Sequence, residues 1–225
     1  MAALRHRAGI DFAILGPSEL CTGDPARRSG NEYLFQMLAT QNIETLNRIG
    51  VRRVITQCPH CFNTLANEYP QYGGNYEVVH HSQFLAELID DGRLDLSRAT
   101  LPERVTYHDA CFLGRHNDIY DPPRRVVGSL GGLDVVEMPR HGSNAFCCGA
   151  GGARVWMEER IGKRIGVERV EEALRTGATR LAVACPFCHI MLDDSLKETG
   201  RAEDIRVADI ATLLLESLEN GEQNT

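Results

Sequence analysis

The sequence lacks any long apolar run. A helix that crosses a bilayer needs about 18 or more predominantly apolar residues in succession, so we expect no membrane span in this chain. The first residues also lack the apolar core of a secretion signal. We therefore predict a cytoplasmic protein, docked at the inner face of a membrane only through a partner or through a region upstream of this chain.

Positive charge is also scarce. The 225 residues carry 24 Lys and Arg against 31 Asp and Glu, a formal net charge of −7. A protein that binds nucleic acid presents a basic face to the phosphates, so this balance argues against a nucleic-acid partner. The apolar (43%) and charged (24%) fractions are ordinary for a globular protein, and the chain is long enough for one large domain or two small ones.

Cysteine is what the sequence has in excess, with eight residues. A disulfide framework is not expected, because the chain shows no export signal and is long enough to fold without covalent staples. In a reducing compartment, clustered cysteines are more often metal ligands or redox catalysts. Their positions along the chain decide between these roles.

Parts of the chain repeat each other. The matching segments are 48–61 with 175–188, 77–81 with 204–208, 21–23 with 147–149, and 11–15 with 134–138. The first pair reads as a helix end, a glycine, a short strand and a Cys-Pro-x-Cys motif that opens a new helix. The second pair reads as a strand, an N-cap residue (Ser82 or Asp209) and an apolar helix, and the last pair reads as strands.

The second copy is longer than the first. It adds a strand at 104–108, then Cys111 and a helix, whereas the first copy has only residues 1–8 in place of that helix. We therefore expect that the chain begins inside its first unit, with a partial first module at 1–95 and a complete second module at 96–225. Alternating strands and helices predict an α/β fold of two repeated parallel-sheet modules that bind ligands at the strand ends.

Five cysteines of the complete copy lie at three predicted strand-to-helix turns. They are Cys111, Cys147, Cys148, Cys185 and Cys188. Thiolates are soft ligands for iron, and helix N-termini stabilise their negative charge. Gly149 and Gly151 would let the backbone approach a bound group closely, because they carry no Cβ. This pattern predicts an iron–sulfur cluster.

Two other uses of the cysteines stay open at this point. A structural zinc site needs only four ligands, which two Cys-x-x-Cys pairs could supply. The pairs belong to separate copies, however, and zinc would leave the adjacent Cys147 and Cys148 without a role. Cys58 and Cys61, after a strand and at the start of a helix, also match a thioredoxin-like dithiol.

The order Cys…Cys-Cys-Gly…Cys-x-x-Cys resembles the cysteine-rich CCG domain found in heterodisulfide reductase, in the glycolate oxidase iron–sulfur subunit and in lactate-utilisation proteins. The sequence around these cysteines is most similar to the C-terminal part of bacterial iron–sulfur oxidoreductases that accept electrons from electron transfer flavoprotein. The segments that carry this resemblance are 21–28, 30–36, 58–65, 107–116 and 147–152. They span nearly the whole chain.

The resemblance implies a [4Fe-4S] cluster on the five cysteines of the second module, in a non-cubane form in the heterodisulfide reductase relatives. The first module departs from the pattern, because Thr22 stands where the second cysteine of the pair would be. Its remaining thiols are Cys21, Cys58 and Cys61, so a cubane cluster there would need a fourth ligand, from His60 or from the absent upstream segment. Without that ligand we expect this site to be empty or degraded.

Several residues beside the cysteines are candidates to tune a cluster through hydrogen bonds, with a purely structural role as the alternative. They are His108, Asp109, Gly149, Gly151, His60 and His81. A helix expected at 161–174 has an apolar stripe that includes Ile161 and Val170, with charged residues such as Arg169 and Glu172 around it. We expect that helix to serve core packing only.

The function that follows is electron transfer by an iron–sulfur oxidoreductase subunit or domain. Its electron partners would be a flavin dehydrogenase or electron transfer flavoprotein on one side, and a quinone or another iron–sulfur centre on the other. One alternative is reduction of a disulfide at the cluster, as in heterodisulfide reductase. Another is a zinc-stabilised interaction module without redox chemistry.

Overall fold

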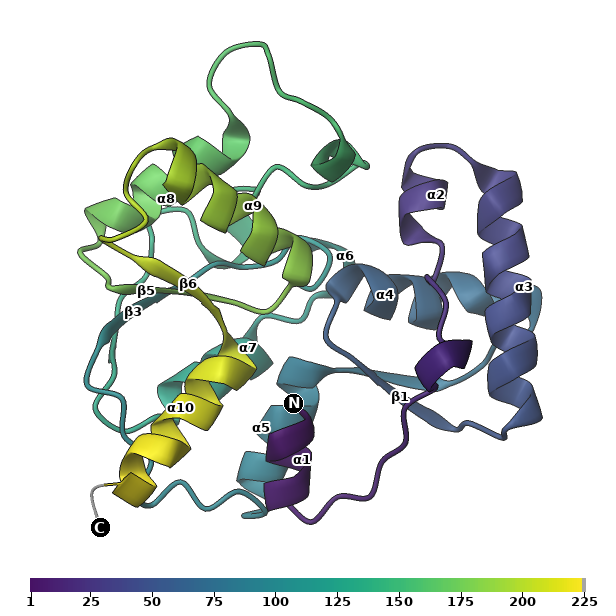
Figure 1. The fold of residues 1–225 in the computed structure, drawn as a ribbon, viewed down its shortest axis with the longest axis horizontal. Helices are drawn as coiled ribbons and strands as arrows, with labels where there is room; N and C mark the ends of the chain where they lie inside the picture. Colours follow the sequence, from purple (N-terminus) through teal and green to yellow (C-terminus); the bar gives the residue numbers. More distant parts are fainter. Residues whose placement is uncertain (224–225) are drawn as a thin grey trace.

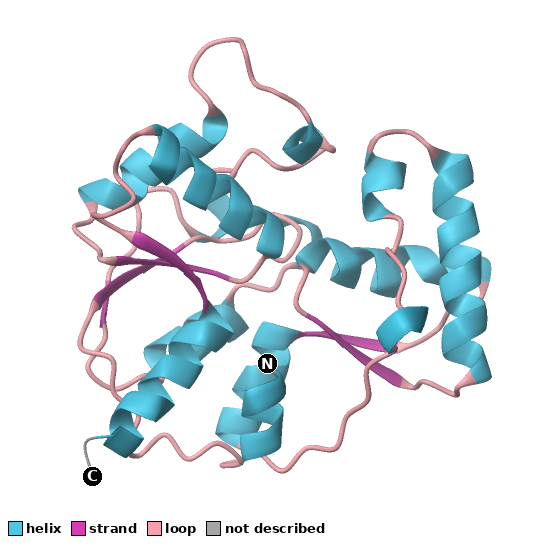
Figure 2. Cartoon of the chain, in the orientation of Figure 1, coloured by secondary structure: helices cyan, strands magenta, loops and turns pink. Residues whose placement is uncertain are grey.

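The computed structural model describes residues 1–223. Two parallel sheets lie side by side with helices around them (Figures 1 and 2), so the predicted α/β class is confirmed. The helices are α1 (Ala2–Arg7), α2 (Asp24–Arg28), α3 (Glu32–Arg48), α4 (Pro59–Asn63), α5 (His81–Asp90), α6 (Gly114–Asn117), α7 (Asp121–Gly128), α8 (Ile165–Arg175), α9 (Pro186–Glu198) and α10 (Ile210–Gln223). The strands are β1 (Arg53–Thr56), β2 (Glu77–His80), β3 (Arg104–Tyr107), β4 (Asp134–Val135), β5 (Arg180–Val183) and β6 (Arg206–Asp209).

The larger sheet has four parallel strands in the order β4-β3-β5-β6. Its central strands are apolar and buried, because helices cover both faces: α8 and α9 lie on one side and α7 and α10 on the other (Figure 1). Tyr107 of β3 pairs with Ala182 of β5, and Val183 pairs with Asp209 of β6. These pairings align the carboxyl ends of the strands along one edge, where the cysteine-bearing turns begin.

The smaller sheet contains only β1 and β2. The strand predicted at 11–15 is wrong, because these residues have no regular secondary structure. Its counterpart β4 pairs with β3 alone, and the first copy has no equivalent of β3 within residues 1–223. An isolated strand has no ladder of hydrogen bonds to join, so local strand propensity is not sufficient here.

The cap of α5 also differs from the prediction. The N-cap residue is His80 rather than Ser82: Nδ1 of His80 accepts from the Ser82 amide (3.3 Å), and the Gln83 side chain accepts from the His80 amide (3.0 Å). Asp209 acts in the same way for α10, since it accepts from the Ala211 amide at 2.8 Å. His80 is therefore the structural counterpart of Asp209, so the predicted pairing of Ser82 with Asp209 is wrong.

The apolar core is shared between the two copies. The smaller core lies beside β1 and β2 and contains Phe35 and Tyr69, whereas the larger core surrounds the four-stranded sheet. Leu4 of α1 and Leu85 of α5 belong to the larger core, although both come from the predicted first module. The two sheets are thus held together by common packing, which fixes one cysteine-bearing edge against the other.

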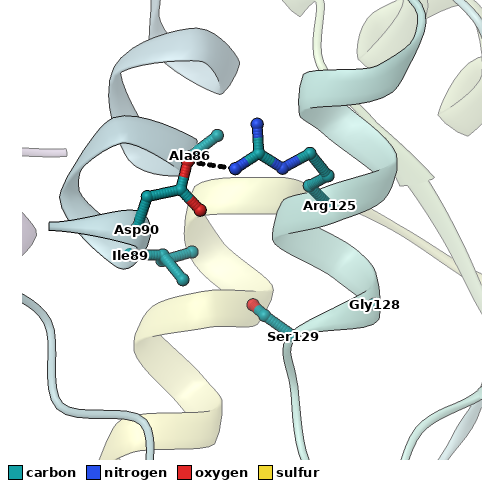
Figure 3. A pocket seen from close by; sticks show the side chains of 6 residues that line it. All are labelled: Ala86, Ile89, Asp90, Arg125, Gly128 and Ser129. Atoms are coloured by element: carbon teal, nitrogen blue, oxygen red, sulfur yellow. Dashed lines mark hydrogen bonds and ion pairs between the residues drawn. The ribbon is translucent and has the colours of Figure 1, made fainter. Parts of the chain in front are cut away.

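The hollow drawn in Figure 3 lies between α5 and α7 and contains no cysteine. Asp90 and Arg125 form an ion pair across it, with Ile89 and Ser129 below them. Both charged side chains are about half exposed, so the pair adds little to stability. In the described part of the chain, no helix is both long and apolar enough to cross a membrane.

Gly221 in α10 gives a test of this packing. A methyl group at Gly221 would overlap the carbonyl oxygen of Arg98, whereas a methyl group at Gly128 in α7 would meet nothing within 4 Å. We expect Gly221→Ala to lower the free energy of unfolding by about 1–3 kcal/mol because of this overlap, although Ala is normally favoured over Gly within a helix. Gly128→Ala should raise it by about 0.4–1 kcal/mol. Urea denaturation measures both, and a stabilised Gly221→Ala variant would contradict the packing described.

Candidate metal centre

The two Cys-Pro-x-Cys motifs open helices, as predicted. The proline of each motif is the first residue of α4 or α9, a position that suits proline because the amide there has no partner within the helix. Cys58 and Cys185 are therefore N-cap residues. Cys61 and Cys188 follow one turn later on the same helix face.

The five thiols of the second copy form a continuous row. Hydrogen bonds between side chains link Cys111 to Cys147, Cys147 to Cys148, Cys148 to Cys188, and Cys188 to Cys185. Cys148, Cys185 and Cys188 are buried, and Cys111 and Cys147 are partly exposed. Thiols from distant parts of the sequence thus meet in one pocket at the carboxyl edge of the larger sheet.

The row of thiols continues into the first copy. The thiol of Cys185 also shares a hydrogen bond with Cys58, which in turn shares one with Cys61. The rings of His60 and Phe187 meet edge to face, with centroids 4.9 Å apart. Cys58 corresponds to Cys185 and His60 to Phe187 in the sequence repeat, so equivalent residues touch one another. Contacts of this self-matching kind relate the two copies by an approximate twofold axis.

Two thiols of the row, Cys147 and Cys185, have lowered pKa values, whereas the thiols next to them have raised ones. Hydrogen bonds from Cys111 and then Cys148 lower the pKa of Cys147 to about 2, with help from the Gly149 amide at 3.2 Å. Burial opposes ionisation of Cys185, yet bonds from Cys188 and Cys58 hold its pKa well below the usual value. Thiolates at Cys147 and Cys185 thus accept hydrogen bonds from neutral neighbouring thiols. Because a metal binds thiolates, those shared protons would be released on metal binding.

The first copy contains a smaller version of the same turn. The Gly23 amide donates to Cys21 Sγ at 3.4 Å, as the Gly149 amide does to Cys147, and the two glycines have φ of +90° and +96°. Thr22 Oγ1 donates to Cys61 Sγ at 3.4 Å. Cys148 makes the corresponding contact with Cys188, so Thr22 occupies the position of the missing thiol.

His60 lies at the junction of the two copies. Its Nδ1 is 2.9 Å from Asp24 Oδ2, and its ring stacks on Phe112 with centroids 3.9 Å apart. Asp24 also pairs with Arg28 at 3.2 Å. These contacts commit one ring nitrogen of the predicted fourth ligand to a carboxylate and one ring face to Phe112.

Two other predicted residues support the turns. Asp109 accepts from Arg124 at 2.6 and 2.9 Å and from the Gly142 amide at 2.8 Å, which ties the turn before Cys111 to a neighbouring loop. His81 is fully buried, with Nε2 3.3 Å from Asp209 Oδ1. Asp109 therefore holds backbone in place, whereas His81 lies beside the N-cap residue of α10.

The predicted glycines serve different purposes. Gly149 needs its left-handed φ, and a Cβ there would lie 3.3 Å from Ile165. Nothing lies within 4 Å of a Cβ built on Gly151. Gly149 therefore shapes the turn, whereas a side chain at Gly151 would meet open space.

Arg169 and Glu172 are the residues that sequence reasoning missed. The helix predicted from Ile161 begins only at Ile165, and Ile161 is 96% exposed. Arg169, assigned there only to the surroundings of the apolar stripe, is completely buried and pairs with Glu172 at 3.0 Å. The available signal was the spacing: opposite charges three residues apart can bury together as a neutral unit.

His108 is the histidine nearest the thiols. A ring nitrogen of His108 and the sulfurs of Cys148 and Cys188 lie within 4.8 Å of one another, and within residues 1–223 no other group of three or more such ligands is as compact. Burial and then the charge of Arg169 lower the pKa of His108 to about 3, so the ring is neutral. The cysteines of the two Cys-Pro-x-Cys motifs do not form a compact four-ligand zinc site.

The family model for the cysteine-rich CCG domain matches residues 1–66 and 105–193. The chain belongs to this CCG family. The predicted family is thus confirmed, and both matched parts contain cysteines of the row of thiols.

Several named proteins are similar to this CCG chain over nearly all of its length. It is 44% identical to the EtfAB:quinone oxidoreductase of Syntrophomonas wolfei and 43% identical to the probable iron-sulfur-binding oxidoreductase FadF of Bacillus subtilis, over 97% and 96% of this chain. It covers 31% of each of these relatives. It is 36% identical to one subunit of the dihydromethanophenazine:CoB–CoM heterodisulfide reductase of Methanosarcina barkeri, over 95% of this chain and 53% of that protein.

The low pKa of Cys147 predicts selective labelling of the reduced, metal-free protein. At pH 6, well above its pKa of about 2, Cys147 carries about 300-fold more thiolate than an ordinary thiol of pKa ~8.5. Cys58, with a pKa raised to about 12, is protonated. We expect iodoacetamide to modify Cys147 before Cys58, as read by peptide mass spectrometry. Urea-unfolded protein is the control, and equal labelling of Cys147 and Cys58 in the folded protein would contradict the assignment.

Proposed function

We propose that this chain holds an iron–sulfur cluster on Cys111, Cys147, Cys148, Cys185 and Cys188 and transfers electrons through it. The observation that carries this proposal is the unbroken row of five thiols in one pocket. Thiolates are the ligands of such clusters, and the pocket adds the amide of Gly149 as a donor to sulfur. When bound, the cluster supplies a site that gains and loses one electron.

Five thiols are one more than a cubane [4Fe-4S] cluster takes. The surplus favours the non-cubane form of [4Fe-4S] at the second module, residues 96–225. The first module, residues 1–95, offers only three thiols and the Thr22 hydroxyl, so we propose that it binds a cluster less firmly. The protein's own contribution is to position these side chains, exclude water and set the potential.

The electron partners follow from the relatives. One relative's name joins electron transfer flavoprotein to quinone, so we propose a flavin dehydrogenase or electron transfer flavoprotein as donor and a quinone or another iron–sulfur centre as acceptor. The relatives are longer than this chain. We propose that any contact of this protein with the cytoplasmic face of a membrane is made through a partner or through regions like the additional ones of these relatives. Disulfide reduction is the second candidate, supported by the similarity to heterodisulfide reductase.

Anaerobic purification tests this function. We expect brown protein with iron and acid-labile sulfide, and an EPR signal in one oxidation state. Colourless protein with stoichiometric zinc would replace the proposal with the zinc-module alternative. Release of thiols from an added disulfide, with a changed EPR signal, would favour disulfide reduction over simple electron transfer.

Two serine variants separate the two modules. Cys148 is buried within the row of five thiols, whereas Cys21 is exposed in the three-thiol site. We expect Cys148→Ser to lose iron and alter the EPR signal, and Cys21→Ser to change both much less. Equal and negligible effects would argue against a cluster at the second module.

A third variant tests the role of Thr22. Because its hydroxyl stands where the second module has a thiol, Thr22→Cys completes the cysteine pair of the first module. We expect more iron and sulfide per chain than in the wild type. Ser at the same position is the control, since it keeps a hydroxyl, and equal iron in the Cys and Ser variants would contradict the correspondence.

A further inference from the structure

Arg169 is completely buried and contacts His108, the histidine nearest the thiols of the second module. Its Nη1 donates to Glu172 at 3.0 Å and to the Arg140 carbonyl at 2.9 Å, and its Nε lies 3.0 Å from Nδ1 of His108. A guanidinium has donors only. Nδ1 of His108 must therefore accept, which means that it carries no proton.

The hydrogen bond from Arg169 Nε to His108 Nδ1 decides the tautomer of His108. A neutral imidazole has one protonated and one bare nitrogen, so the proton must be on Nε2. The amide of His108 is fixed by a bond to the Ala182 carbonyl at 2.9 Å, and a ring nitrogen lies within 4.8 Å of the sulfurs of Cys148 and Cys188. The ring thus has a single N–H, and the nearest acceptors described for it are cysteine sulfurs.

We propose that His108 donates a hydrogen bond from Nε2 to a cluster-binding sulfur of Cys148 or Cys188, and that buried Arg169 positions it as a donor. This inference rests on the proposed cluster and deepens it. It makes His108 a residue that sets the reduction potential. Arg169 acts only through His108 and is a positioning residue.

The direction of the effect follows from charge. A hydrogen bond to sulfur withdraws electron density from the thiolate, so it stabilises the reduced cluster, which is more negative, and raises the potential. Because the bond strengthens as the cluster gains negative charge, we expect its loss to shift the reduction equilibrium about tenfold toward the oxidised cluster. For a one-electron couple, tenfold corresponds to about 59 mV.

The same contact argues against His108 as a metal ligand. A histidine that binds a metal through one nitrogen normally donates the N–H of the other to a carboxylate or carbonyl. Here Arg169 occupies that other nitrogen as a donor, so Nε2 cannot give up its proton without leaving an imidazolate. His108, Cys148 and Cys188 are compact enough to hold zinc, yet Arg169 disfavours it.

The test compares two amide variants of matched polarity. In His108→Gln the side-chain NH2 reaches about as far as Nε2, whereas in His108→Asn it reaches only as far as Nδ1. In EPR-monitored redox titrations of anaerobically purified protein, we expect Gln to retain the wild-type potential and Asn to lower it by about 59 mV, the tenfold shift in equilibrium argued above. Equal potentials in Gln, Asn and wild type would overturn the donor role.

A measurement on the wild type covers the case in which a variant does not fold. With 15N-labelled histidine, ENDOR on the paramagnetic cluster should detect a weak 15N coupling, typical of a hydrogen bond, and an exchangeable proton lost in D2O. A strong coupling would show direct ligation, and no coupling would show that His108 does not contact the cluster. Either result would overturn the proposal.

Arg169 needs a paired change, because its removal alone would strand the buried carboxylate of Glu172. We expect Arg169→Met with Glu172→Gln to lower the potential as His108→Asn does, with iron content unchanged. An unchanged potential in the folded, iron-loaded double variant would refute the positioning role. Protein without iron in every variant and in the wild type would refute the proposed function itself, which keeps the two failures distinct.

Discussion

The constraint on which this structure depends is that parallel strands end at the same edge of a sheet. Each strand of the larger sheet delivers its following turn to that edge, so Cys111 after β3 and Cys185 after β5 become neighbours. Burial of both faces of the sheet fixes the strands, and the strands fix the turns. The approximate twofold axis then sets the edge of the smaller sheet against the first, with Cys58 on Cys185.

Charged groups near the thiols are paired with opposite charges. Arg169 pairs with Glu172, Arg124 with Asp109, and Asp24 with both His60 and Arg28. Burying such pairs brings little net stability, because desolvation offsets much of the attraction. Their effect here is geometric: each one ties a cysteine-bearing turn or its flanking histidine to a helix, so that the sulfurs and the donors around them keep a defined arrangement.

Much of the fold and of the cysteine pocket could be predicted from the sequence. The Cys-Pro-x-Cys helices were predictable because proline at a first helical position is a local preference, and the five cysteines because their turns follow strands. Features that depend on a distant partner were not. The absence of a strand at 11–15 reflects a missing neighbour, and the burial of Arg169 depends on His108, which lies in another element. The contact between Cys58 and Cys185 depends on how two modules pack.

The shared core has a consequence for how the chain is built. Helices α1 and α5 come from one sequence repeat, yet Leu4 and Leu85 fill the interior of the other. An excised second half would present a bare apolar face in water, and an excised first half would lose the surface that covers these leucines. The two halves are therefore alike in sequence and interdependent in folding. Recombination that exchanged one half alone would have to preserve the apolar contacts that Leu4 and Leu85 make with the other half.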